Sequence, residues 1–404
     1  MSDLINNKRV PRLRFPSFDE NWGITSLEKI GKVIRGASPR PKGDPRFYGG
    51  DVPRLMVQDV TRDGKYVTPR IDYLTEAGSK LSRPCKAGTL TIVCSGTVGI
   101  VSFLAVDACI HDGFLALIDI DHNTVDDDFL YHQLSTLREK FERSATHGGV
   151  FTNLTTTGIK EFIVRVTVLE EQRKIAAALQ AVDDKLTALR RKRERLTTYK
   201  RGLMQQLFSQ ELRFTRADGR PFPDWEVRRI GSLIEEFKEN SIVQDQHEVF
   251  TSARFGLIRQ KDYYENARIT DRKNIGFNII PPNYITYRSR SDNRSFYFNE
   301  NSLGETGIIS VYYPVFRFVN GVNKFFTELF AQNRHYIGKF SVGTSQTVLS
   351  LNELKKIKFL VPCPEEQQKI ADCLTAVDDK INAVAQQIDQ IDTCKKGLLQ
   401  QMFV

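Results

Sequence analysis

The sequence lacks the signatures by which membrane-inserted, secreted and disulfide-bonded proteins are usually identified. Its 404 residues contain no apolar run near the length of about 20 that a membrane-spanning helix requires. Residues 1–10 lack the apolar stretch of a signal peptide. The six cysteines are far apart and include no Cys-x-x-Cys pair, so neither a disulfide framework nor a zinc site is indicated. We therefore expect a cytoplasmic protein.

Recognisable catalytic motifs are also missing. No Gly-x-Gly occurs, which leaves no dinucleotide fingerprint and no usual S-adenosylmethionine loop, and the Gly-Lys pairs lack the preceding glycine of a phosphate-binding loop. The six histidines form no His-x-His or His-Glu-x-x-His pair. Ile280-Pro-Pro-Asn-Tyr284 resembles an amino-methyltransferase motif, but Ile280 stands where that chemistry needs a polar side chain. We therefore expect a non-catalytic chain with no metal and no cofactor.

What the sequence does contain is one long stretch that occurs twice. Residues 170–209 align without gaps with residues 365–404, at a constant offset of 195, and 20 of the 40 positions are identical. The identities gather in an opening (Glu-Glu-Gln-x-Lys-Ile-Ala), a middle segment (Ala-Val-Asp-Asp-Lys) and an ending (Gly-Leu-x-Gln-Gln-x-Phe). Agreement of this extent indicates an internal duplication.

Each copy has the pattern of one long helix. Its apolar residues follow a 4-3-4-3 stagger over about five heptads, which is typical of a coiled coil. Lys395 interrupts the apolar seam of the second copy, and Arg193 and Lys200 interrupt that of the first. An amphipathic helix packed on its own domain is the simpler alternative. Two seams of equal length suit each other better, so we predict that the helices pair.

Charge and connectivity predict how the helices pair. Residues 170–209 hold 10 Lys/Arg and 5 Asp/Glu (net +5), whereas residues 365–404 hold 4 and 7 (net −3). Opposite charge favours pairing of one copy with the other. If the two halves of the chain are related by a pseudo-two-fold axis, the helices run antiparallel. The predicted globular domains, which we call the heads, are residues 1–168 and 210–363, and the predicted helices are residues 169–209 and 364–404.

The duplication extends into the heads. Leu13-Arg-Phe15 recurs as Leu212-Arg-Phe214, each followed by a tryptophan, Trp22 or Trp225. Residues 88–92 resemble residues 283–287, and residues 99–103 resemble residues 307–311. We predict strands at residues 90–93, 100–104, 114–120 and 357–361, and helices at residues 127–141, 324–335 and 352–355. The predicted fold class is α+β, with two globular heads in a pseudo-two-fold repeat, separated by an antiparallel two-helix coiled coil.

The loops of both heads combine cations with small polar and aromatic side chains. Residues 35–48 carry this mixture, and residues 288–297 carry it most densely. Arginine and lysine bind phosphates and guanine, asparagine and glutamine bind adenine, and serine and threonine bind either. The chain has a net charge of +9, and subtracting the helices (+5 and −3) leaves +7 on the heads, which favours an acidic partner such as DNA. For any single residue, a solvated loop position is the alternative.

The duplicated motifs resemble those of the specificity subunit of bacterial type I restriction–modification enzymes. Gly36-Ala-Ser-Pro39, with residues 47–53, also resembles that family's first recognition loop. The resemblance implies that each head is a target-recognition domain for one half of a bipartite double-stranded DNA sequence, and that the helices fix the spacer. It also implies two methyltransferase (modification) subunits and a motor–nuclease (restriction) subunit as partners, which carry all the catalysis.

Two sets of residues are predicted to make these contacts. The DNA-binding set is Arg35, Ser38, Arg40, Lys42, Arg54, Gln58, Thr97, His147, Asn153, Arg254, Arg288, Arg290, Asn293, Arg294, Tyr312 and Gln346. The methyltransferase-binding set consists of polar positions that both helices share outside the seam: Glu171, Gln172, Asp184, Gln206, Glu366, Gln367, Asp379 and Gln401.

Two alternatives stay open. One is a two-headed scaffold protein whose coiled-coil spacer joins protein-binding heads, which the positive charge of the heads disfavours. The other is a half-methyltransferase with an unrecognised active site, which binding of S-adenosylmethionine by the chain alone would favour.

Overall fold

The computed structural model describes residues 10–144, 146–148, 151–263, 273–344 and 346–403. Within these ranges, no helix is both long and apolar enough to cross a bilayer. The repeated stretches form helices α7 (Leu169–Phe208) and α12 (Pro364–Met402), as the heptad pattern predicts.

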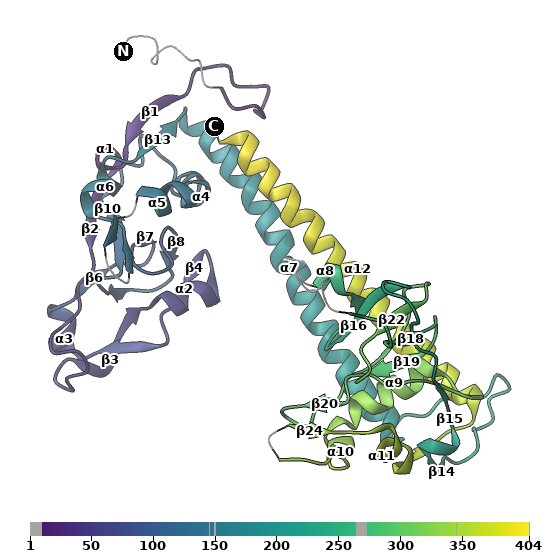
Figure 1. The fold of residues 1–404 in the computed structure, drawn as a ribbon. Helices are drawn as coiled ribbons and strands as arrows, with labels where there is room; N and C mark the ends of the chain where they lie inside the picture. The colour runs from purple at the N-terminus through teal and green to yellow at the C-terminus, as the bar shows by residue number, and fades with distance from the viewer. Residues whose placement is uncertain (1–9, 145, 149–150, 264–272, 345, 404) are drawn as a thin grey trace. The chain divides into compact units, whose positions relative to one another are not determined.

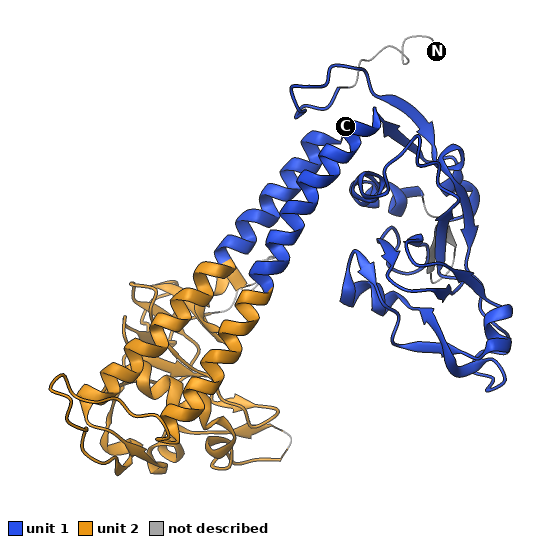
Figure 2. Ribbon diagram, turned by 180° about the vertical axis from the view of Figure 1, so that it is seen from behind, with its two compact units in different colours: residues 1–190, 386–404 blue, residues 191–385 orange. Residues whose placement is uncertain are grey.

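The chain folds as two compact units (Figure 2). Unit 1 comprises residues 1–190 and 386–404, and unit 2 comprises residues 191–385. Each unit therefore contains one head with part of α7 and part of α12. Within each unit the two helices lie side by side and antiparallel, so that the end of one meets the start of the other (Figure 1).

Unit 1 is built on a five-stranded sheet of order β2-β10-β7-β8-β4 and a four-stranded sheet of order β5-β3-β9-β6, with the short pairs β1-β13 and β11-β12. The strands are β1 (Gly23–Ser26), β2 (Lys32–Arg35), β3 (Tyr48–Leu55), β4 (Tyr66–Val67), β5 (Asp72–Leu74), β6 (Arg83–Cys85), β7 (Leu90–Val93), β8 (Val101–Leu104), β9 (Ala108–Ile110), β10 (Phe114–Ile118), β11 (Thr146–Gly148), β12 (Phe151–Asn153) and β13 (Ile163–Val166). The helices are α1 (Leu27–Ile30), α2 (Val57–Asp63), α3 (Glu76–Lys80), α4 (Asp127–Thr136), α5 (Arg138–Ser144) and α6 (Thr156–Lys160).

Both faces of the five-stranded sheet are covered, which explains why every residue of β7 and β8 is buried. Side chains alternate between the faces of a strand. Leu90 and Ile92 of β7 face a core that contains α4 and parts of the long helices. Val93 faces the four-stranded sheet, where it packs in a second core with Leu55 and Ile110.

Unit 2 repeats this plan with the sheets β15-β23-β19-β21 and β17-β16-β22-β18 and the pairs β14-β25 and β20-β24. The strands are β14 (Glu226–Arg229), β15 (Ile234–Phe237), β16 (Glu248–Ala253), β17 (Gly256–Arg259), β18 (Asn278–Ile280), β19 (Ile285–Tyr287), β20 (Arg290–Ser291), β21 (Phe298–Glu300), β22 (Gly307–Ile309), β23 (Val315–Phe318), β24 (Thr347–Val348) and β25 (Lys358–Val361). The helices are η1 (Ile230–Ser232), α8 (Gln260–Tyr263), α9 (Asn323–Gln332), α10 (Arg334–Gly338) and α11 (Leu351–Lys356).

The strand orders confirm the duplication and correct one detail of it. β2-β10-β7-β8 matches β15-β23-β19-β21, with every pairing antiparallel in both. The parallel pair β3-β9 matches the parallel pair β16-β22. The likeness of residues 88–92 to 283–287 is confirmed, because both form the same central strand. The likeness of residues 99–103 to 307–311 is wrong, because the first run forms β8 whereas β22 matches β9.

Several predicted elements differ in their ends. The single helix predicted at residues 127–141 is divided at Leu137 into α4 and α5, and that predicted at residues 324–335 is divided at Asn333 into α9 and α10. The predicted strand at residues 114–120 ends at Ile118. The apolar periodicity continues through Leu137, and neither helix has a glycine or proline at its break, so the sequence does not mark these ends.

Equivalent aromatic clusters fix the helix ends to the heads. In unit 1, Phe403 lies against Trp22 and Phe129, with ring centroids 6.4 and 5.2 Å apart. In unit 2, Phe208 and Trp225 both contact Phe325, at 5.6 and 6.0 Å. Phe208 and Phe403 are the same position of the repeat, and burial of such rings is a major source of stability.

The lysines that interrupt the seams are paired in the same way in both units. In unit 1, Lys395 of α12 contacts Asp183 of α7 at 2.5 Å. In unit 2, Lys200 of α7 contacts Asp378 of α12 at 2.8 Å. Lys200 and Lys395 are equivalent in the repeat, and so are Asp183 and Asp378. Each of these two lysines is therefore matched by the first aspartate of the Val-Asp-Asp-Lys segment in the other helix.

The two heads place different residues next to these ion pairs. The Gln172 side chain accepts a hydrogen bond from the Asp126 amide, and its repeat equivalent Gln367 accepts one from the Val322 amide. Asp126 and Val322 are therefore equivalent, so residues of α4 correspond to residues of α9 at an offset of 196. In unit 2, Glu328 of α9 accepts a hydrogen bond from Lys200 at 2.9 Å. The matching position of α4 is His132, which is 1% exposed, and burial lowers its pKa to about 4. The neutral imidazole of His132 thus takes the place of a carboxylate.

Replacement of Asp378 tests the ion pair of unit 2. Burial by itself raises the pKa of Asp378, but Lys200 and Lys324 outweigh it, so the pKa lies below its ordinary value. A lowered carboxyl pKa stabilises the fold at pH values above the unfolded-state pKa of about 3.9, and this stabilisation is lost as the pH falls through the folded-state value. Asp378→Asn should destabilise unit 2 by about 1–3 kcal/mol at neutral pH.

The measurement is thermal unfolding of both proteins between neutral and acidic pH. The difference between wild type and Asp378→Asn should shrink below about pH 4. The exposed neighbour Asp379 supplies the control, because Asp379→Asn should leave the unfolding midpoint unchanged. Equal effects of the two substitutions would contradict the assignment.

Candidate DNA-binding surfaces

The Glu-Glu-Gln motif that opens each long helix is buried. Glu171 and Glu366 are both 0% exposed. Arg14 donates two hydrogen bonds to Glu171, at 2.7 and 2.8 Å, and Arg213 donates two to Glu366, at 3.1 and 2.9 Å. The repeated Leu-Arg-Phe segment is thereby tied to the start of the helix in its own unit.

Burial corrects half of the predicted methyltransferase-binding set. Gln172 donates to the Thr124 and Thr167 carbonyls, and Gln367 donates to the Pro362 carbonyl. These side chains satisfy backbone groups that would otherwise be unpaired, so repetition reflects a structural role. The positions corrected in this way are Glu171, Gln172, Glu366 and Gln367. The other four, Asp184, Gln206, Asp379 and Gln401, are exposed and stay predicted partner contacts.

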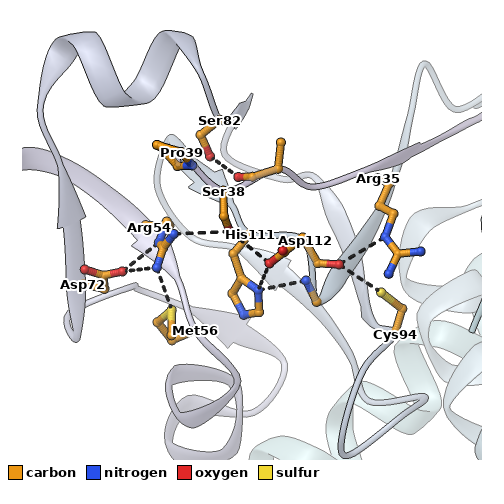
Figure 3. Close-up of polar contacts among 12 residues, drawn as sticks. Arg35, Ser38, Pro39, Arg54, Met56, Asp72, Ser82, Cys94, His111 and Asp112 are labelled. Carbon is orange, nitrogen blue, oxygen red and sulfur yellow. Dashed lines mark hydrogen bonds and ion pairs between the residues drawn. The ribbon is translucent and has the colours of Figure 1, made fainter. Parts of the chain in front are cut away.

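In unit 1, Asp112 contacts three of the predicted DNA-binding residues, two of which, Arg35 and Ser38, are drawn in Figure 3. Its carboxylate accepts a hydrogen bond from Ser38 at 2.9 Å and contacts Arg40 at 3.2 Å. Its backbone carbonyl accepts one from Arg35 at 3.1 Å. The side chains of Arg40 and Asp112 are 71% and 50% exposed, so both remain available to a ligand.

The loop that carries Ser38 and Arg40 is held close to this cluster by its glycine. A Cβ at Gly36 would overlap the carbonyl oxygen of His111. The Gly36 amide bonds the Phe114 carbonyl at 2.9 Å, and the Ala37 amide bonds the Ile110 carbonyl at 3.1 Å. The Gly-Ala-Ser-Pro motif therefore presents its polar residues on a backbone fixed to β9 and β10.

Arg54 is a buried residue that contacts the cluster through Ser38. It is 4% exposed, and its guanidinium is paired with Asp72 at 2.5 Å and lies 5.0 Å from the Tyr48 ring centroid. Charged groups at this depth are kept in place by their partners. Arg54 therefore positions the loop, and it reaches Ser38 at 3.4 Å (Figure 3).

The remaining predictions of unit 1 are scattered. Lys42, Gln58 and Thr97 are exposed, on the loop before β3, on α2 and in the turn after β7, respectively. The side chains of His147 and Asn153 lie outside the described residues, although their backbones belong to β11 and β12.

In unit 2, arginines lie on aromatic rings. The Arg290 guanidinium lies 4.0 Å from the ring centroid of Tyr312, which is 50% exposed. Tyr297 contacts two guanidinium groups, Arg334 at 4.3 Å and Arg254 at 6.0 Å. Stacking of this kind holds a guanidinium flat while its edges remain free to donate hydrogen bonds.

The densest predicted cluster forms a tight turn. Asn293 accepts hydrogen bonds from the Ser291 hydroxyl at 3.0 Å and from the Ser295 amide at 3.1 Å, so its side chain carbonyl shapes the loop. Arg288 and Arg294 are exposed, and Gln346 donates to Asp292 at 3.4 Å.

A hollow of about 360 Å³ opens beside this turn, between Asn293, Arg294 and Ser295 on one side and Arg334, His335, Gly338 and Lys339 on the other. A Cβ at Gly338 would overlap the Arg294 carbonyl oxygen, so glycine is what allows α10 to approach the turn. Sequence reasoning missed Arg334 and Lys339 here and Asp112 in unit 1. The available signal in unit 2 was the Arg334-His335 pair at the end of the helix predicted at residues 324–335.

The described residues contain no group of three His, Cys, Asp or Glu side chains placed to hold a metal ion. Burial raises the pKa of the Cys85 and Cys94 thiols to about 11, so both are protonated at neutral pH.

Residues 19–198 and 223–393 each match the family model of the type I restriction modification DNA specificity domain, and the chain belongs to this family. It is 22% identical to the type I restriction enzyme MjaVIII specificity subunit of Methanocaldococcus jannaschii, over 98% of this chain and 94% of that protein. It is 23% identical to the MjaIX specificity subunit of the same organism, over 70% of this chain but 65% of that protein. The expectation of a non-catalytic chain agrees with these relatives, which are specificity subunits.

Solved structures share the fold. The S subunit of a type I restriction–modification system from M. genitalium superposes with a TM-score of 0.61 at 14% identity, over 98% of this chain and 99% of that one. A chain from a structure of the assembly and conformational transition of a type I system gives a TM-score of 0.57 at 15% identity, over 95% and 97%. The predicted fold class, with two α+β repeats and two long antiparallel helices, is confirmed.

Substitution of Gly338 tests the approach of α10 to the turn. Gly338→Ala should destabilise unit 2 by about 1–3 kcal/mol, because the added methyl group displaces the Arg294 backbone. Gly202 offers a control of opposite sign, since it lies inside α7 with open space around it, and Gly202→Ala should stabilise by up to about 1 kcal/mol. Thermal unfolding measures both, and an unchanged midpoint for Gly338→Ala would contradict the packing described.

Proposed function

We propose that this chain is the DNA-specificity subunit of a type I restriction–modification complex, in which each unit reads one half of a bipartite, asymmetric target. The observation that carries the proposal is one scaffold, repeated in its main strands, with two different sets of polar loop residues. Asp112 and Tyr312 precede equivalent strands, β10 and β23, whereas Ser38 and Arg40 follow β2 and Arg290 follows β19. Different sets select different bases, so the two half-sites are unlike.

The chemistry of each set suits base edges in the major groove. The stacked, planar Arg290 can donate two hydrogen bonds to guanine O6 and N7. In unit 1, Asp112 can accept a hydrogen bond from a cytosine amino group, while Arg40 beside it donates to guanine or to a phosphate. The surplus of positive charge on the chain favours approach to DNA before either contact forms.

The partners follow from the repeat in the helices. Asp184 and Asp379 are exposed equivalents, and so are Gln206 and Gln401. Two like surfaces suit two copies of one partner. We propose that they dock two methyltransferase subunits, which bring the catalytic site and S-adenosylmethionine, and that motor–nuclease subunits join through that complex.

Co-expression of the chain with its methyltransferase subunit, followed by sequencing of the methylated DNA, tests the function. The expected result is methylation within one asymmetric two-part sequence. A two-headed scaffold is the competing function, and it would be favoured if the complex assembles but methylates no two-part sequence.

Single substitutions should affect one half-site each. Arg290→Lys keeps the charge but loses the planar fork, so discrimination at one base pair should fall by about 1–3 kcal/mol in one half-site. Asp112→Ala should cause a loss of the same size in the other half-site. Competition binding with duplexes that carry single base-pair changes measures both effects.

A control substitution and a contrary result complete this test. Arg220 is paired with Asp218 and lies outside both clusters, so Arg220→Lys should leave both half-sites unchanged. If both cluster variants altered the same half-site, one reader per unit would be refuted.

The length of the helices should set the spacer. Insertion of one heptad after Arg190 and one after Ala385 keeps the seams in register and adds about 10 Å to each helix. At 3.4 Å per base pair, the spacer should lengthen by about three base pairs while both half-sites stay the same. Methylated-DNA sequencing reads the new spacer directly. A heptad inserted in α7 alone breaks the register and should abolish methylation, and an unchanged spacer in the double insertion would contradict the proposal.

A further inference from the structure

The hollow beside the turn at residues 293–295 concentrates positive charge. Arg294, Arg334 and Lys339 line it, and the residues that line it include no carboxylate. Among the described residues, none of these three cations forms an ion pair. Other arginines of the same head are paired, such as Arg259 with Glu305 and Arg317 with Glu235. Unpaired cations that converge on a hollow repel one another until an anion enters.

Arg334 is held ready for such an anion. Its guanidinium lies 4.3 Å from the Tyr297 ring centroid, which fixes its plane. Its Nε atom is buried, and among the described residues it has no hydrogen-bond partner. Leaving a buried donor of a charged group unpaired is costly, so a site of this kind is completed by an acceptor from outside the fold.

The opposite wall of the hollow is fixed by the backbone. Arg294 has φ 57°, a conformation that non-glycine residues adopt at some cost. The side chains of Ser291 and Asn293 stabilise the turn by hydrogen bonds to the Ser295 amide, at 3.0 and 3.1 Å. Close contact of Gly338 with the Arg294 carbonyl then sets the width of the hollow. The cations therefore need little rearrangement to bind.

We propose that this hollow binds one phosphate group of the DNA backbone, and that Arg334 and Lys339 are the residues that neutralise it. The inference rests on the proposed function and adds a division of labour within unit 2. Arg290 lies on the ring of Tyr312, and its side chain forms no ion pair among the described residues, which suits a flat base edge. The cations of the hollow come from both of its walls, Arg294 from the turn and Arg334 and Lys339 from the other side, which suits a phosphate that accepts from several directions. The phosphate contact fixes the position of the head and Arg290 reads the base.

The experiment uses the full chain in complex with its methyltransferase subunit. Affinity for a duplex with the methylated sequence, and for one without it, is measured over a range of KCl concentrations for Arg334→Gln and Lys339→Gln. Loss of one phosphate contact should reduce the slope of log K against log salt by about 1, and at about 0.1 M salt both duplexes should bind about eightfold more weakly. The ratio of the two affinities should stay constant. Lys356→Gln, which removes an exposed lysine paired with Glu353, controls for the change in net charge and should keep the slope.

Three results would overturn the inference. A changed affinity ratio in Arg334→Gln would make Arg334 a base reader. If the slope of log K against log salt is unchanged in both variants, the hollow does not bind a phosphate of the DNA. An unchanged slope combined with weaker capture of the methyltransferase subunit would assign the hollow to an acidic protein partner. Failure of the proposed function is distinguishable, because the wild-type complex would then bind both duplexes equally.

Discussion

Each long helix carries a lysine in its apolar seam, Lys200 in α7 and Lys395 in α12. The helices pair in the arrangement in which both lysines have an acidic partner. Lys200 and Lys395 occupy the same position of the repeat, and each reaches the aspartate that is the repeat equivalent of the other's partner. This reciprocity requires the antiparallel direction. It also sets the register, because a shift by one heptad would place an alanine or an arginine, and no carboxylate, opposite each lysine.

The two units share the buried contacts that stabilise them and differ in their exposed loops. Three features recur in both units: the buried arginine–glutamate pairs, the hydrogen bonds of Gln172 and Gln367 to backbone amides, and the aromatic clusters. The exposed loops do not: unit 1 arranges its arginines around a carboxylate, and unit 2 arranges its arginines on tyrosine rings. Exposed loops of this kind can differ between the two units without loss of stability.

Sequence patterns predicted the features that depend on periodicity and failed where burial decides. The heptad stagger predicted α7 and α12 because apolar spacing is visible in one dimension. The repeated Glu171 and Glu366 were misinterpreted as a partner surface, since repetition alone cannot separate an exposed polar residue from one bonded within the fold. Asp112 and Arg334 went unnoticed because their role depends on side chains that approach only in the folded chain, such as Ser38 and Tyr297. The likeness of residues 99–103 to 307–311 misled because β-rich segments share composition.

Unit 1 has His132 at the position where unit 2 has Glu328, so the stabilities of the two units depend differently on acidic pH. In unit 2 the seam lysine contacts two carboxylates, Asp378 and Glu328, and the pKa of Asp378 lies below its ordinary value. In unit 1 the buried imidazole is neutral near Lys395, and protonating it would place two cations together in a site that excludes water. Acidification toward pH 4 would therefore weaken the packing of the first head against its helices before that of the second.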